Sequence, residues 1–249
     1  MSKEQISSTY LEETKRTYLC DNESPWDAFV VGSNEQDNIG SAIAQYLRAH
    51  LWTVNEFDKH NWSPFALAEH GKHLSTIVLC NGYTHLDWIE NQPDKEIIES
   101  VFVNLSVSML AAKHFVQNTI NNPWPKYIVF IGSMAYRNVL NGSAPYCAAK
   151  AGLAHFARCI AYELAPKNYN VFCVHPSNTE GTPMTEKTIQ ELQRYRNLTR
   201  EQAEQYWGTG LPRNVWLQPT DIAELVAFLV SGKADYMSGG NIDLTGGQR

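Results

Sequence analysis

The chain has 249 residues, of which 43% are hydrophobic and 18% are charged, and its formal net charge is −6 at pH 7. This length and composition suit a single globular domain with a sizeable core. The negative charge, without a basic block, argues against nucleic acid and anionic membranes as partners, and no apolar run approaches the roughly 20 residues that span a bilayer.

The amino terminus and the cysteines indicate the cellular compartment. Residues 1–5 lack the apolar core of a secretion signal. The five cysteines are scattered and odd in number, which is typical of reduced thiols rather than of a disulfide framework or a zinc site. The eight histidines show no ligand set for a metal. We therefore expect a cytoplasmic protein without a bound metal.

Strands and helices are predicted to alternate after a polar amino-terminal extension of residues 1–26. Short apolar runs indicate the strands, and longer periodic segments indicate the helices. The predicted strands cover residues 28–31, 52–57, 75–80, 127–132, 170–175 and 241–244. The predicted helices cover residues 41–50, 63–72, 94–120, 146–165, 185–207 and 220–230.

This alternation predicts right-handed crossovers and a doubly wound parallel sheet of the α/β class, with helices on both faces. Residues 27–249 then form one domain. The polar segment near residues 180–216 is expected to be a substrate lid. Its aromatic residues, Trp207 among them, could line a substrate pocket or simply pack within the lid.

The most informative motif consists of Ser133, Tyr146 and Lys150. Ser133 follows the apolar run 127–132, and the other two residues are four positions apart, so they share one face of a helix. A hydroxyl at the carboxyl end of a parallel strand, facing a phenol and an ammonium, makes a site for proton transfer to a carbonyl oxygen. The lysine cation is expected to lower the tyrosine pKa from its usual value of about 10. A tyrosine four residues before a lysine is, by itself, common by chance.

Other motifs accompany this set in a fixed order. They include the turn from Gly32 to Gly40, Asn104 in a predicted helix, Pro176 after a strand, and the glycine-rich segment 238–247. Together these motifs resemble the short-chain dehydrogenase/reductase family across roughly residues 28–247. The resemblance implies a Rossmann-like fold and an NAD(P)-dependent oxidoreductase. Such an enzyme interconverts a carbonyl and an alcohol of a small molecule by hydride transfer.

The resemblance also implies a catalytic tetrad of Asn104, Ser133, Tyr146 and Lys150. Tyr146 would act as general acid/base, and Lys150 would hold a hydroxyl of the nicotinamide ribose. Ser133 would orient the substrate oxygen. Asn104 would hold a water that links Lys150 to solvent, although by its spacing alone it is merely a polar residue within a helix.

The turn after the first strand is longer than the family's usual pattern of Gly, three residues, Gly, one residue, Gly. Here Gly32 is followed by five residues and then by Asn38, Ile39 and Gly40, with asparagine in place of the middle glycine. Asn38 tolerates left-handed backbone better than most residues. The turn is expected to bring backbone amides to a pyrophosphate at a helix amino terminus. The alternative is a loop that no longer holds a dinucleotide.

Asp58 lies 18 residues after Gly40, near the offset at which an acid contacts the adenosine ribose of NAD. A carboxylate there repels a 2′-phosphate, so we expect NAD(H) to be favoured over NADP(H). The neighbouring Lys59 could instead pair with a phosphate, and Asp58 could be a simple turn residue.

Four further cofactor contacts follow from the resemblance. Where the family usually has Asn-Asn-Ala-Gly, this chain has Leu79-Cys80-Asn81-Gly82, and the usual Pro-Gly appears as Pro176-Ser177. Thr182 resembles the residue that contacts the nicotinamide carboxamide, although its offset from Pro176 is one residue longer than usual.

Only 16 residues, 59–74, separate the second predicted strand from the next strong one. Family members of ordinary length place a strand and a helix there. We therefore expect six strands, with the usual edge strand missing or vestigial.

The two long helices, 94–120 and 146–165, and the carboxyl-terminal segment resemble the family's subunit interfaces, which implies a homodimer or homotetramer.

Two other functions stay open. The long cofactor turn resembles that of enoyl-thioester reductases, but that branch places its tyrosine seven residues before the lysine, where this chain has Ser143. A non-catalytic nucleotide-sensing or scaffold protein would explain the altered cofactor motifs. It would have no need of an intact serine, tyrosine and lysine set.

Overall fold

The computed structural model describes residues 27–32, 38–50, 52–57, 74–209, 211–212 and 215–248. Its six strands form one sheet in the order β2-β1-β3-β4-β5-β6, and every neighbouring pair is parallel. The predicted doubly wound sheet is therefore confirmed. The strands are β1 (Asp27–Val31), β2 (Thr53–Phe57), β3 (Leu74–Leu79), β4 (Lys126–Ile131), β5 (Tyr169–Pro176) and β6 (Asn241–Leu244).

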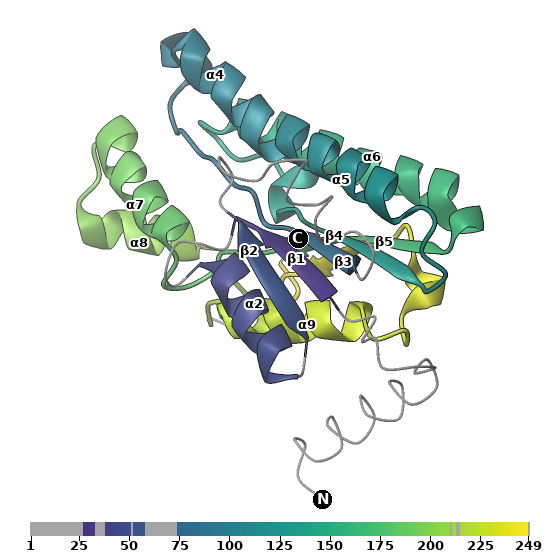
Figure 1. Cartoon of the computed structure of the whole chain (residues 1–249). Coiled ribbons are helices and arrows are strands. Elements are labelled where there is room, and N and C mark those ends of the chain that lie inside the picture. Colours follow the sequence, from purple (N-terminus) through teal and green to yellow (C-terminus); the bar gives the residue numbers. More distant parts are fainter. Residues whose placement is uncertain are drawn as a thin grey trace, which may run out of the picture.

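Helices cover both faces of the sheet, with α2 and α9 on one side and α5 and α6 on the other (Figure 1). Residues 1–26 and 58–73 lie outside the described residues. They include the predicted extension, the predicted 63–72 helix and the segment where the edge strand was expected to be missing or vestigial. The described helices are α2 (Ile39–Ala49), α4 (Asp94–Val101), α5 (Val107–Thr119), α6 (Ala144–Leu164), α7 (Pro183–Arg196), α8 (Arg200–Gly208) and α9 (Pro219–Leu229).

Two of the predicted helices are interrupted. The 94–120 segment contains a π-helical turn, η2 (Phe102–Ser106), between α4 and α5. The 185–207 segment divides into α7 and α8, because Asn197 adopts a left-handed conformation (φ 54°) that ends α7. Thr199 then starts α8 with a capping box that includes Gln202.

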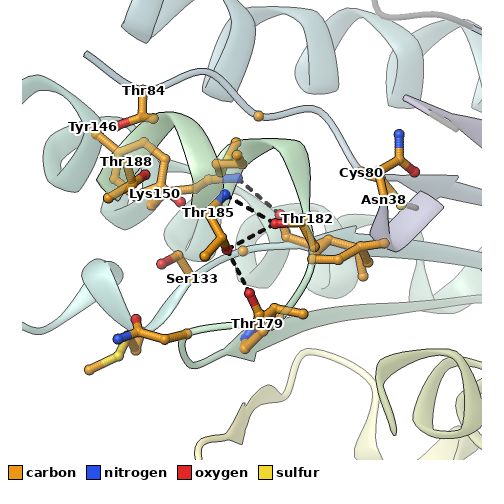
Figure 2. A pocket seen from close by; sticks show the side chains of 18 of the residues that line it. Asn38, Cys80, Thr84, Ser133, Tyr146, Lys150, Thr179, Thr182, Thr185 and Thr188 are labelled. Carbon is orange, nitrogen blue, oxygen red and sulfur yellow. Dashed lines mark hydrogen bonds between the residues drawn. The ribbon is translucent and has the colours of Figure 1, made fainter. Parts of the chain in front are cut away.

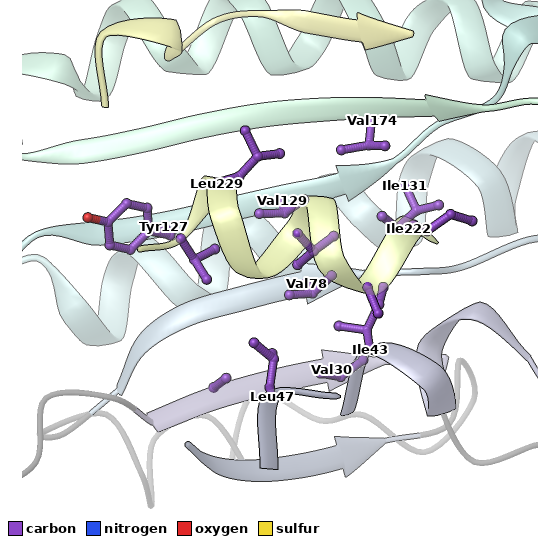
Figure 3. Close-up of a cluster of buried hydrophobic side chains, with 14 of the residues drawn as sticks. Val30, Ile43, Leu47, Val78, Tyr127, Val129, Ile131, Val174, Ile222 and Leu229 are labelled. Carbon is purple, nitrogen blue, oxygen red and sulfur yellow. The ribbon is translucent and has the colours of Figure 1, made fainter. Parts of the chain in front are cut away.

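The core consists of two apolar layers that enclose the sheet. On one face, Ile43 and Leu47 of α2 and Ile222 and Leu229 of α9 pack over the strands (Figure 3). On the other face, the second layer includes Phe115 of α5 and Leu153 of α6. Because β3, β4 and β5 are covered on both sides, every residue in these strands is buried, which explains their continuous apolar runs.

The sheet brings the carboxyl ends of β1 and β3 close together. Gly32 follows β1 with φ +90°, and a Cβ built on it would lie 3.2 Å from the backbone carbonyl of Cys80, which follows β3. A side chain at position 32 would be both strained and crowded. This is the topological switch point of the sheet, because the chain leaves β1 for one edge and returns at β3 on its other side.

The α7–α8 segment is tied to the loop after β3. Glu191 accepts a hydrogen bond from the Leu86 amide (3.1 Å), and Arg194 donates to the Leu86 carbonyl (2.8 Å). Leu86 also packs with Ile189, Leu192 and Ala203 in a small apolar cluster. The segment predicted as a lid therefore lies against this loop, residues 80–88, which we call the 80s loop. None of the helices in the described ranges is long and apolar enough to cross a bilayer.

Candidate functional site

A pocket at the carboxyl ends of β1, β3, β4 and β5 gathers nearly all the residues singled out in the sequence. Asn104 lies outside its lining, and Asp58 lies outside the described residues. Figure 2 shows Ser133, Tyr146 and Lys150 in this pocket, near the threonines at the start of α7. The predicted residues that line it are Gly32, Asn38, Ile39, Gly40, Asn81, Gly82, Ser133, Tyr146, Lys150, Pro176 and Thr182.

Ser133 and Tyr146 meet because β4 ends where α6 begins to cover it. The backbone of Ser133 is extended, and its Oγ accepts a hydrogen bond from the Ala135 amide (3.2 Å). Tyr146 lies in the first turn of α6, where Pro145 suits the helix start. Burial raises the pKa of Tyr146 to about 12, although a hydrogen bond from Ser133 opposes the rise.

The expected lowering of the Tyr146 pKa by Lys150 is therefore wrong for the chain by itself. The ammonium lies 5.7 Å from the centre of the phenol ring, and the loss of hydration of the phenolate dominates. Tyr146 thus carries its proton at neutral pH.

Lys150 is only 2% exposed, and its ammonium ties two strand ends together. Its Nζ donates to the carbonyl of Ile131 (3.0 Å), the last residue of β4, and to that of Asn81 (3.2 Å), two residues after β3. Burial lowers the pKa of Lys150 to about 8. An ammonium has three N–H donors, so one remains for a ligand beyond these two carbonyls.

Asn104 is fully buried in the π-helical turn η2 and holds the loop that forms one wall of the pocket. Its Nδ2 donates to the carbonyls of Tyr83 (2.7 Å) and Ser100 (2.8 Å), and its Oδ1 accepts from the Tyr83 amide (3.2 Å). Both of its N–H groups are thus used on backbone, within an interrupted helical ladder. The structure gives this side chain a positioning role, and the water predicted beside it stays a prediction.

Asn38 acts as the cap of α2, and its tolerance of left-handed backbone is not used. Its backbone is extended (φ −98°), because its Oδ1 accepts from the Ser41 amide (2.7 Å) as helix caps do. Its Nδ2 donates to the Gly32 carbonyl (3.2 Å), which joins the two ends of the turn.

The first residues of α2, Ile39 and Gly40, present a helix amino terminus to the pocket. Their N–H groups have no partner within the helix, and the helix dipole favours an anion there. These groups fit the pyrophosphate of a dinucleotide.

The remaining predicted contacts have structural tasks of their own. A Cβ on Gly82 would lie 2.4 Å from Met184, so the glycine lets α7 approach the 80s loop. The Thr182 hydroxyl caps α7 by accepting from the Thr185 amide (3.1 Å). Asn81 donates from Nδ2 to Ser108 (3.3 Å). Their contacts with a cofactor stay predictions.

A family model described as Enoyl-(Acyl carrier protein) reductase matches residues 54–249. The chain belongs to the short-chain dehydrogenase/reductase family. It is 28% identical over 172 residues to the 3-oxoacyl-(acyl-carrier-protein) reductase FabG of Rickettsia conorii. The matched segment covers 69% of this chain and 66% of that protein. The FabG protein of Haemophilus influenzae is 28% identical over 226 residues, or 88% of this chain and 87% of that protein.

A solved structure of a short chain dehydrogenase family protein from Francisella tularensis has the same fold. It matches 91% of this chain and 99% of its own with a TM-score of 0.77, at 24% identity. The sequence-based prediction of family and fold is therefore confirmed.

Several pocket residues escaped the sequence reasoning. They come from the 80s loop, from the connections between β4 and α6 and between β5 and α7, and from α7, whose residues have no fixed motif. Pocket lining and packing within the lid were both open for Trp207, and it does both, since it lines the pocket and packs against the Leu86 cluster. The lining residues that the sequence reasoning did not single out include Cys80, Thr84, Leu86, Met134, Leu140, Ser143, Asn178, Thr179, Met184 and Thr188.

The positioning role of Asn104 predicts a loss of stability on substitution. Asn104→Leu keeps the branched shape but leaves the Tyr83 and Ser100 backbone groups without this partner, so the free energy of unfolding should fall by roughly 2–4 kcal/mol. Urea denaturation measures this free energy of unfolding. The matched control is Asn118→Leu, which removes a single hydrogen bond to the His114 carbonyl and should cost less than about 1 kcal/mol. Equal effects of the two substitutions would contradict the role of Asn104.

Proposed function

We propose that this protein is an NAD(P)-dependent oxidoreductase that interconverts a carbonyl and an alcohol of a small molecule. The observation that carries the proposal is the convergence of Ser133, Tyr146 and Lys150 in one pocket with the amino terminus of α2. The named relatives, which are reductases, support it as well.

The dinucleotide would supply or accept the hydride. The N–H groups of Ile39 and Gly40 would hold its pyrophosphate, and the remaining N–H of Lys150 would bind a ribose hydroxyl. Gly82, which has no side chain, would let this ribose lie close to the 80s loop.

Tyr146 would donate its proton to the carbonyl oxygen as the hydride arrives, while the Ser133 hydroxyl donates a hydrogen bond to the same oxygen. The raised pKa of Tyr146 suits the reduction direction, because the phenol is protonated at neutral pH. In the oxidation direction the phenolate is required, so that rate should increase as the pH rises toward about 12.

The description of the matching family model, Enoyl-(Acyl carrier protein) reductase, gives the enoyl-reductase alternative some support. The position seven residues before Lys150 is Ser143, which lines the pocket and offers no phenol there. The non-catalytic alternative is opposed by the intact set of three residues. Both alternatives therefore rank below carbonyl reduction.

A homodimer or homotetramer is also proposed. Large apolar side chains on α4, η2 and α5 are exposed, among them Ile98 (68%), Phe102 (49%) and Leu110 (43%). Exposed apolar groups that cluster on one set of helices support burial against another subunit.

Substitution of Tyr146 tests the chemistry. Tyr146→Phe should lower kcat for carbonyl reduction by about a thousandfold, because no acid replaces the phenol, and should change the Kd of the cofactor by less than about twofold. Turnover can be assayed on a panel of 3-oxoacyl thioesters and small ketones. Tyr162→Phe is the control, since Tyr162 lies on the same helix and is 87% exposed. Strong residual activity in Tyr146→Phe would rule out its proton-transfer role.

The cofactor preference rests on Asp58 and is tested by titration. Purified protein titrated with NADH and with NADPH, followed by nicotinamide fluorescence, should bind NADH at least about tenfold more tightly, because a carboxylate repels the 2′-phosphate. Asp58→Asn should narrow that difference. A preference for NADPH would transfer the selecting role to Lys59, and no binding of either would make the non-catalytic alternative the leading one.

A further inference from the structure

His175 is a buried imidazole that the proposed chemistry does not use. It lies near the end of β5, is 0% exposed, and is absent from the pocket lining. Yet its ring reaches the backbone of Ser133, a residue 42 positions away in the sequence.

The hydrogen-bond ladder between β4 and β5 explains why a side chain is needed there. The Gly132 amide donates to the Val174 carbonyl (2.7 Å), and the next bond in a parallel ladder would come from the amide of residue 176. That residue is Pro176, which has no N–H. The ladder stops, and the His175 ring provides the next link between the two strands.

The ring meets both polar groups of the Ser133 backbone. The Ser133 amide donates to Nδ1 at 3.3 Å, and the Ser133 carbonyl lies 3.1 Å from the same nitrogen. The carbonyl already accepts from the Tyr136 amide (3.0 Å). The amide depends on Nδ1, because buried backbone N–H groups are rarely left without a partner. The neutral ring therefore carries its proton on Nε2, which donates to Asn241 Oδ1 (3.0 Å).

Packing fixes the position of this ring. The Tyr136 ring stacks on it with centroids 3.8 Å apart and an interplanar angle of 21°. On another side it touches Gly132, where a Cβ would lie only 2.4 Å from Nδ1. The ring cannot move away from Ser133 without disturbing these neighbours.

We propose that His175 is a positioning residue for Ser133 and makes the alignment of that hydroxyl depend on pH. The neutral ring accepts from the Ser133 amide and holds the backbone in place. A protonated ring can only donate, so its Nδ1–H bonds to the Ser133 carbonyl, which already lies 3.1 Å away, and repels the Ser133 amide. The peptide then shifts, and the Ser133 hydroxyl loses its alignment with Tyr146.

Charged and titratable groups face the ring from several elements. Asp243 of β6 favours the protonated form and Lys150 of α6 disfavours it, while Tyr136 stacks against the ring and Cys173 lies near it on β5. Burial dominates and lowers the pKa of His175 below its ordinary 6.5, ahead of the opposing effects of Asn241, Ser133 and Asp243. The switch should therefore operate below pH 6.5.

Nuclear magnetic resonance of the wild-type protein tests the contact without any assay of activity. In the ¹⁵N-labelled chain, His175 should carry its ring proton on Nε2 at neutral pH, and the Ser133 amide signal should titrate with the same midpoint as the ring. A proton on Nδ1 at neutral pH, or a Ser133 amide signal that does not follow the ring, would overturn the proposal. This result stands whether or not the proposed function holds.

Kinetics test the consequence, which rests on the proposed function. His175→Asn keeps a non-titrating acceptor but loses the link to Asn241, so kcat should fall by about tenfold or more with little change in KM or in cofactor Kd. In the wild-type protein kcat should decline in acid as His175 becomes protonated, and this decline should disappear in His175→Asn. His155→Asn, which removes an exposed imidazole from α6, should retain the wild-type profile. An unchanged kcat and an unchanged acid decline in His175→Asn would overturn the proposal.

Discussion

The buried ammonium of Lys150 is the constraint on which the site depends. A charge that is removed from water must find hydrogen-bond partners, and here the partners are the carbonyls of Asn81 and Ile131. These two groups fix the ends of β3 and β4 relative to α6. Tyr146, one helical turn before Lys150, and Ser133, two residues beyond Ile131, are brought together as a result.

The way each strand ends supplies the rest of the geometry. Gly32 lets the end of β1 lie against Cys80, and Asn38 closes the turn that follows by bonding to the Gly32 carbonyl. On β5, Pro176 stops the ladder and leaves the connection to β4 to the His175 side chain. Local backbone chemistry at the ends of β1 and β5 thus shapes a pocket that receives a helix amino terminus, a phenol and an ammonium.

The sheet and the proton-transfer set could be predicted because their signals are local. The apolar runs of β3, β4 and β5 reflect burial on both faces, and the spacing of Tyr146 and Lys150 is a property of one helix. The roles of Asn104 and His175 could not be predicted, because their partners, Tyr83 and Ser133, are distant in the sequence. The pKa of Tyr146 escaped prediction for a related reason, since burial is set by the whole fold.

The pKa of Lys150 tests this account most directly. It can be measured from the side-chain ¹⁵Nζ signal of the protein without cofactor, assigned by its absence in Lys150→Met. The account predicts a value near 8, well below the ordinary 10.5, because the ammonium is buried. A value near 10.5 would show that the ammonium is hydrated and would contradict the arrangement of the strand ends around it.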